Sequence, residues 1–161
     1  MPGTSLSIPA RRATWAPWYA APAAAALSIG AGYVHLAYTQ DHWRDWWAYG
    51  AFFLAAGAVQ LAYGVLVLRW PRPLVALLGI GAHLAVVAMY VQTRTVGIPL
   101  GPHERVKERV GAVDLATTVA EILVVVLLLT LVGARTRRWT VNLLLVAGAA
   151  LWVLRVTVGS A

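Results

Sequence analysis

A stripe of polar residues runs along one face of an otherwise apolar segment. Its members stand at spacings i, i+3, i+4 and i+7, which places them on one face of an α-helix; they are Asp114, Thr117, Thr118 and Glu121. Residues 122–129, which follow directly, are all apolar. A carboxyl group in such surroundings is costly unless it faces other protein or a wet cavity. We therefore predict that Asp114 and Glu121 supply negative charge to an interior site.

Four other apolar segments carry polar residues that could face the same interior. The first of these segments carries His35, the second Gln60, the third His83 and Tyr90, and the last Arg155. His83 and Tyr90 are seven residues apart and so share a helical face. The predicted ligand-binding residues are Asp114, Glu121, Arg155, Tyr90 and Gln60.

Two imidazoles and a carboxylate also make up the donor set of a metal site. Such ligands suit Zn or Cu(II), so His35, His83 and Glu121 are the predicted metal ligands. The alternative is that each histidine only hydrogen-bonds between helices. A haem held by His35 and His83 is less favoured, because helical rise places them about 6 Å and about 15 Å deep, whereas axial ligands of one iron need similar depth.

Several kinds of chemistry are absent from the sequence. It has no Cys, which excludes disulfides, thiolate metal sites and Cys nucleophiles. The motifs GxSxG and HExxH and a phosphate-binding P-loop are also missing. An enzyme that uses Glu121 or His83 as a general acid or base is therefore the least favoured hypothesis, and binding is preferred to catalysis.

The composition indicates which elements must position these residues. Of the 161 residues, 60% are apolar and 12% charged, against roughly 45–50% and about 25% in soluble domains. Five stretches approach the roughly 20 residues needed to cross about 30 Å of hydrocarbon; they cover residues 16–38, 47–68, 74–92, 113–132 and 139–158. We predict a single all-α membrane domain, a polytopic bundle of five transmembrane helices. Cleavage of the first stretch as a signal peptide would leave four.

Basic residues between the stretches predict the orientation. With the N-terminus inside, the cytoplasmic side collects Arg11, Arg12, Arg69, Arg72, Arg135, Arg137 and Arg138 and no acidic residue. This is the positive-inside pattern, and it explains the net charge of +7 without nucleic acid as a partner. We expect a cell-membrane protein with a cytoplasmic N-terminus and an external C-terminus.

In this topology the polar residues border a cavity that opens outward. We expect the segments 40–45 and 93–112 to cover it as loops, with a short helix at 103–109. Helical rise places Glu121 on the order of 12 Å and Arg155 about 5 Å below the outer rim, so the two could form an ion pair. The alternative interpretation is that this pair only holds two helices in register.

The loop regions also carry a resemblance. The segments YVHLAY (33–38), HWRDWWAYG (42–50), RTVGIPLGP (94–102) and VGAVDL (110–115), with Glu121 beyond, cover much of the chain. They resemble uncharacterised small multi-pass membrane proteins of high-GC bacteria. The resemblance implies a membrane fold and no particular activity.

The sequence thus favours a small integral membrane protein that binds or translocates a metal ion, a proton or a small polar solute in an outward pocket. The alternative is an accessory or assembly subunit of a larger membrane complex, such as a haem-associated one, whose polar residues only fix helix order. Its partners would be the lipid bilayer and a second membrane protein or another copy of the chain.

Overall fold

The chain forms an all-helical bundle, which confirms the predicted fold class. The computed structural model describes residues 17–159, and beyond residue 150 it describes only the side chain of Val153. Five helices follow in order: α1 (Ala20–Asp45), α2 (Trp47–Arg69), α3 (Pro73–Thr95), α4 (Ala112–Leu131) and α5 (Ala134–Gly159). Within the described range, the only extended pairing outside the helices is an isolated bridge between Ile98 and Glu104.

Four of the helices, α1 to α4, are long and apolar enough to cross a membrane. Proline marks the start of α3, where Pro73 occupies the first turn and its missing N–H would have had no helical partner in any case. Helices α1, α2 and α4 begin without a hydrogen bond from the side chain of their N-cap residue. Apolar character, rather than capping, therefore accounts for these helices.

The predicted loop at 40–45 is wrong, because α1 continues through it to Asp45. A single residue, Trp46, with φ −166° and ψ 137°, separates α1 from α2. An exposed ion pair between Arg44 and Asp41 at 3.3 Å lies within this last part of α1. Hydropathy predicts only where a helix leaves an apolar environment. The backbone hydrogen bonds of a helix are internal and also form in water, so the helix can continue past that point.

The second predicted break, at 135–138, is also helical, since α5 begins at Ala134. By contrast, the short helix expected at 103–109 does not form. Arg105 has φ 64°, a left-handed conformation that a helix cannot contain. Instead the segment turns back, with the N–H of Ile98 donating to Val106 O and the N–H of Arg105 donating to Ile98 O.

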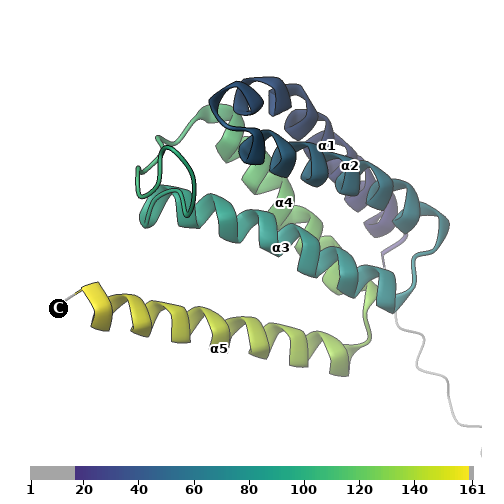
Figure 1. Ribbon diagram of the computed structural model, residues 1–161. Helices are drawn as coiled ribbons and strands as arrows, with labels where there is room; N and C mark the ends of the chain where they lie inside the picture. Colours follow the sequence, from purple (N-terminus) through teal and green to yellow (C-terminus); the bar gives the residue numbers. More distant parts are fainter. Residues whose placement is uncertain (1–16, 160–161) are drawn as a thin grey trace, which may run out of the picture.

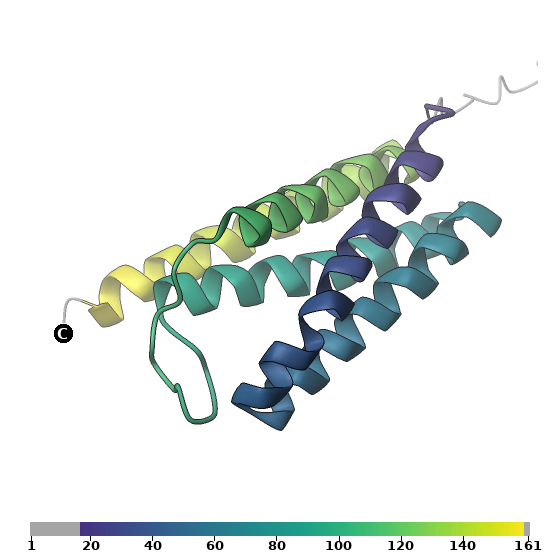
Figure 2. The ribbon, with the colours of Figure 1, turned by 90° about the horizontal axis from the view of Figure 1, so that it is seen from above.

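Close helix packing depends on small residues. Helices α1 and α2 form a hairpin in which the two helices lie side by side, and α4 packs against both α1 and α3 (Figures 1 and 2). A Cβ added at Gly32 of α1 would lie 2.9 Å from Gly57 O of α2. These two glycines therefore form an interhelical contact, as small residues do where helix backbones approach closely in membrane proteins.

The apolar core and the polar residues occupy different ends of the bundle. The core joins the start of α1 (Ala24, Ala25), the end of α2 (Val67), the start of α3 (Ile80) and the end of α4 (Leu128). The polar stripe of α4 begins at the opposite end, beside the segment 96–111. A pocket lies at the end of the bundle that the segment 96–111 covers.

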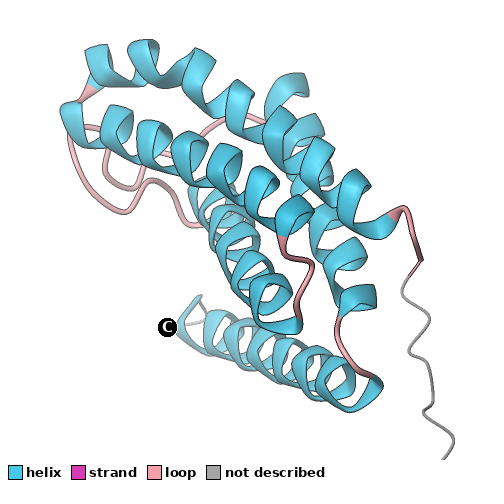
Figure 3. Cartoon of the chain, turned by 90° about the vertical axis from the view of Figure 1, so that its right-hand side faces the viewer, coloured by secondary structure: helices cyan, strands magenta, loops and turns pink. Residues whose placement is uncertain are grey.

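Helix α5 lies apart from the other four (Figures 1 and 3). In the described part of the chain it forms no extensive packing with another helix. Its apolar side chains Leu143, Leu145 and Val146 are all more than 60% exposed. The prediction that this helix joins a common polar interior is therefore not met by the described residues, and the side chain of Arg155 lies outside them.

Candidate functional site

The centre of the candidate site is a buried trio from three helices. Glu121 of α4 is 0% exposed. Its Oε1 accepts a hydrogen bond from Nε2 of Gln60 on α2, and its Oε2 is bonded to Nδ1 of His83 on α3. The carboxyl and the imidazole can exchange a proton along their shared hydrogen bond. The structure thus brings together three of the predicted residues and satisfies both oxygens of the buried carboxylate.

Neighbouring contacts hold Gln60 and His83 in place. Ser28 of α1 donates to the main-chain carbonyl of Gln60 at 2.9 Å. Oε1 of Gln60 is buried without a hydrogen-bond donor among the described residues. Leaving a buried acceptor without a partner costs about 1–3 kcal/mol. The hydrogen bond from Nε2 of Gln60 to Glu121 offsets this cost and favours this position of the amide.

Tyr63 fixes the other side of His83. The two rings meet edge to face with centroids 5.7 Å apart. The hydroxyl of Tyr63 donates to Val75 O at 3.2 Å, and the ring lies against Gly79, where an added Cβ would be 2.0 Å from Tyr63 Oη. Gly79 is therefore the position that lets the tyrosine enter between α2 and α3 and support the imidazole.

A pocket of about 750 Å³ opens above this trio. Helices α1 to α4 and the segment 96–111 all contribute to its lining, and Glu121 is its most buried member. Asp114 stands seven residues earlier on the same helix, about 10 Å away along the axis by helical rise, and also lines the pocket. The polar stripe predicted on α4 thus faces a cavity.

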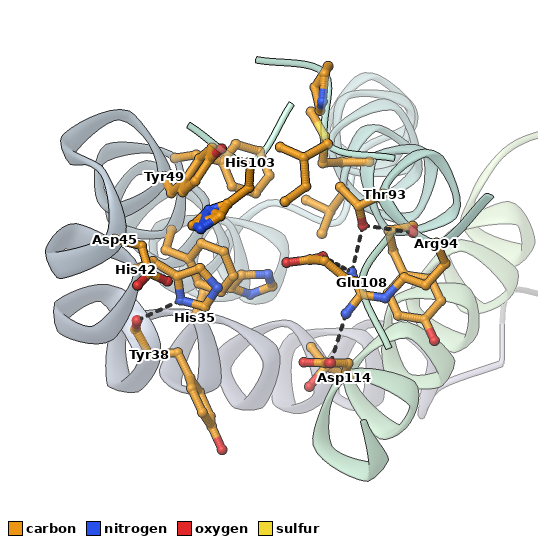
Figure 4. A pocket seen from close by; sticks show the side chains of 18 of the residues that line it. His35, Tyr38, His42, Asp45, Tyr49, Thr93, Arg94, His103, Glu108 and Asp114 are labelled. Carbon is orange, nitrogen blue, oxygen red and sulfur yellow. Dashed lines mark hydrogen bonds and ion pairs between the residues drawn. The ribbon is translucent and has the colours of Figure 1, made fainter. Parts of the chain in front are cut away.

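Arg94 organises one wall of the pocket. Its guanidinium donates to Glu108 Oε2 at 2.5 Å, to Thr93 Oγ1 at 2.6 Å and to Asp114 Oδ2 at 2.8 Å. It also lies 4.4 Å from the ring centroid of Tyr90. Figure 4 shows Arg94 between its two carboxylates, across the pocket from His35 and His42. Because these bonds join α3, α4 and the segment 96–111, Arg94 ties the cover of the pocket to its walls.

The cover also packs directly on the junction of α1 and α2. The hydroxyl of Tyr49 donates to Leu100 O at 2.7 Å. Gly101 has φ 96°, and an added Cβ there would lie 2.6 Å from a ring atom of Trp46. A left-handed backbone in close contact with an indole requires glycine. The expectation that this segment covers the pocket is met, and His103 lines the pocket as expected.

Two histidines form the opposite wall. His35 is 7% exposed, and its Nδ1 donates to Ala31 O at 2.9 Å. His42 makes the same bond to Tyr38 O at 2.9 Å and stacks on Phe53 with centroids 3.6 Å apart. In both rings Nδ1 carries the proton because a carbonyl oxygen only accepts. Nε2 is then an acceptor when the ring is neutral.

The predicted metal set does not assemble as a set. His83 and Glu121 are bonded to each other, whereas no three His, Cys, Asp or Glu side chains in the described residues form a group able to hold a metal. His35 lines the pocket with its own hydrogen bond to the main chain. The described part of the chain therefore offers no three-donor group for Zn or Cu, and the haem between His35 and His83 stays a prediction.

The other predicted ligand-binding residues divide into two groups. Asp114 and Tyr90 line the pocket, although both already contact Arg94. Gln60 lies behind the pocket as a partner of Glu121. The predicted pair of Glu121 with Arg155 falls on a side chain outside the described residues, and the two oxygens of Glu121 are hydrogen-bonded to Gln60 and His83.

Sequence reasoning missed the cation that matters most at this site. The sequence analysis singled out neither Arg94 nor Glu108, which fall within the segments expected as a loop (93–112) and a short helix (103–109). A signal existed, since Arg94 is four residues after Tyr90 and helical residues at this spacing share a face. Comparison of the chain with protein-family models, with curated proteins and with solved structures found no match.

Proposed function

We propose that this chain is a multi-pass membrane protein that binds a small polar solute in the pocket between α1–α4 and the segment 96–111. The observation that carries the proposal is the cavity itself. Its volume of about 750 Å³ falls within the roughly 300–1,000 Å³ of small-molecule sites, which typically combine apolar walls with a few placed polar groups. Solute binding is also the step with which translocation would begin.

The composition of the lining favours a solute over a bare ion. Aromatic side chains come from α1, α2 and α3 and include Tyr38, Phe52, Phe53 and Tyr90. Such rings offer contact area to an organic body, whereas a metal ion needs several converging donors. The Glu121–His83 bond at the base provides a second element, a group that can accept or release a proton when a solute arrives.

We further propose that the pocket opens to the outside of the cell membrane, with the N-terminus cytoplasmic. The pocket lies where α1 ends and α2 begins. The opposite end of the bundle carries Arg69, Arg72, Arg135, Arg137 and Arg138, all of them exposed. Cations near short loops favour the cytoplasmic side, which puts the pocket on the other side.

A pocket-filling variant tests the binding function. Thr118 lines the pocket, and Thr118→Trp should fill part of it. Val126 on the same helix is 53% exposed, so Val126→Trp is the matched control that leaves the pocket open. The purified proteins are screened by thermal unfolding against a library of small polar compounds.

We expect some compounds to raise the Tm of the parent protein and of Val126→Trp but not of Thr118→Trp. At a concentration of 100 Kd, a specific ligand stabilises the folded state by about 2.7 kcal/mol, which such a scan resolves. Equal shifts in all three proteins, or no shifts in any, would contradict the proposal.

Helix α5 supports a second candidate function, that of an accessory subunit. Its described apolar side chains are exposed, and no other described helix packs extensively on it. Under this reading, protein extracted gently from its native membrane should migrate as a stable complex with one partner in fixed stoichiometry. Shortening the chain after residue 133 should abolish that complex while the melting of α1–α4 persists.

A further inference from the structure

Four of the six hydroxyl groups of the pocket lining have already used their protons. Those of Thr93, Thr117 and Thr118 donate to the main-chain carbonyls of Tyr90, Val113 and Asp114 at 3.2, 2.9 and 2.8 Å. The hydroxyl of Tyr49 likewise donates to Leu100 O. A hydroxyl has one proton to donate and two lone pairs. These four groups can therefore only accept hydrogen bonds from a solute.

The imidazoles add acceptors of the same kind. His35 is more than nine-tenths buried and lines the pocket, and its Nδ1 proton is held by Ala31 O. Its Nε2 has no hydrogen-bond partner within the described residues. His42 has the same arrangement with Tyr38 O. In the neutral ring each free Nε2 is a lone-pair acceptor.

The charged side chains of the lining carry an excess of negative charge. The carboxylates Asp45, Glu108 and Asp114 face a single guanidinium, Arg94. Arg94 is already paired with Glu108 and Asp114, and of its N–H groups the buried Nε–H has no hydrogen-bond partner among the described residues. Asp45 forms no ion pair with any described residue. Apart from Arg94, Trp46 is the one donor-only side chain of the lining.

The apolar part of the lining suits a cation as well. Arg94 already lies over the ring of Tyr90 at 4.4 Å, so this lining contains a cation–π contact made by the protein itself. Trp46, which directly follows Asp45 in the chain, and Phe52 add further rings to the lining. Aromatic faces attract ammonium groups within about 6 Å of the ring centroid.

We propose that the solute is a small protonated amine with an apolar body, its ammonium group directed at the carboxylate of Asp45 and at Nε2 of His42, three residues earlier on α1. This inference rests on the proposed function, because it names the chemical class that the same pocket takes. An ammonium group supplies three donors and a positive charge, which complements a lining rich in acceptors and carboxylates. The carboxylates of the lining would instead repel a solute that carries a carboxylate or a phosphate.

Three probes with one apolar body and different polar groups test this proposal. They are 2-phenylethylamine, 2-phenylethanol and phenylacetate, titrated calorimetrically into the full chain in phosphatidylcholine nanodiscs at neutral pH. Binding to Thr118→Trp is the background for partitioning into lipid. Asp45→Asn removes the rim charge at an exposed position, and Asp41→Asn is the matched control, because Asp41 lies four residues earlier on α1 and outside the pocket lining.

We expect the amine to bind at least tenfold more tightly than the alcohol or the acid. Asp45→Asn should weaken amine binding about fivefold, the effect of one partly screened ion pair, and leave the alcohol unchanged. Equal losses in Asp45→Asn and Asp41→Asn would overturn the proposal. Binding of the alcohol or acid as tight as that of the amine, still blocked by Thr118→Trp, would overturn the amine class while the solute pocket stands. Absence of any pocket-dependent binding would overturn both.

Discussion

Two glycines on α3 provide a sharp test of how the site is built. Gly79 and Gly81 are two residues apart on the same helix. A Cβ at Gly79 would lie 2.0 Å from Tyr63 Oη and 2.1 Å from Tyr63 Cζ, whereas a Cβ at Gly81 would meet nothing within 4 Å. We therefore predict that Gly79→Ala destabilises the protein and that Gly81→Ala does not.

The magnitude follows from these distances. Tyr63 is 7% exposed and packs in the core, so it cannot move aside freely. Overpacking of a buried site costs about 1–3 kcal/mol. Replacing glycine by alanine in a helix is favourable by about 1 kcal/mol, and this gain is common to both variants. The difference in unfolding free energy between them should therefore be about 1–3 kcal/mol.

Thermal unfolding in detergent, followed by tryptophan fluorescence, measures the difference. A chain of this size shifts its Tm by about 2–4 °C for each kcal/mol. On a Tyr63→Leu background, the cost of Gly79→Ala should fall toward that of Gly81→Ala. Equal melting temperatures for the two alanine variants would refute the reasoning that Gly79 admits the tyrosine that supports His83.

Two further predictions concern the polar contacts. A double-mutant cycle with His83→Ala and Glu121→Ala should give a coupling energy of about 1.5–3 kcal/mol, because a buried hydrogen bond to a charged group joins them; strictly additive losses of stability would contradict this. Arg94→Met should speed amide hydrogen exchange throughout the segment 96–111, because it leaves Glu108 unanchored. Arg44→Met, which breaks only an exposed pair, is the control, and unchanged exchange in Arg94→Met would count against the anchoring role.

The α4 stripe shows how far sequence reasoning reaches. A carboxyl at position 121 within apolar surroundings has to face protein, so its burial follows from residue type and helical period alone. The same reasoning identified Gln60 and His83 as inward-facing residues. It did not show that they bond to Glu121, since they are 61 and 38 residues away in the chain and helix rotation decides which of many inward residues meet.

Helix ends show where the sequence is least informative. Residues 40–45 and 135–138 are polar and were predicted as breaks, yet both are helical. The polarity of a segment indicates whether its surroundings are apolar or polar. The backbone hydrogen bonds of a helix form in either, so a helix can cross that boundary. The path of residues 103–109 depends on Arg105 in a left-handed conformation, which no pattern in the segment indicates.

The sequence by itself determined the helical fold class, the number of helices and the inward-facing polar residues of α2, α3 and α4, because these follow from the cost of exposing polar groups to lipid. Only the tertiary structure decided that Arg94 pairs with both Glu108 and Asp114, that the metal set is split, and that the pocket is left with free acceptors. Those outcomes depend on distances of a few ångströms between residues far apart in the chain, and only the packed helices set such distances.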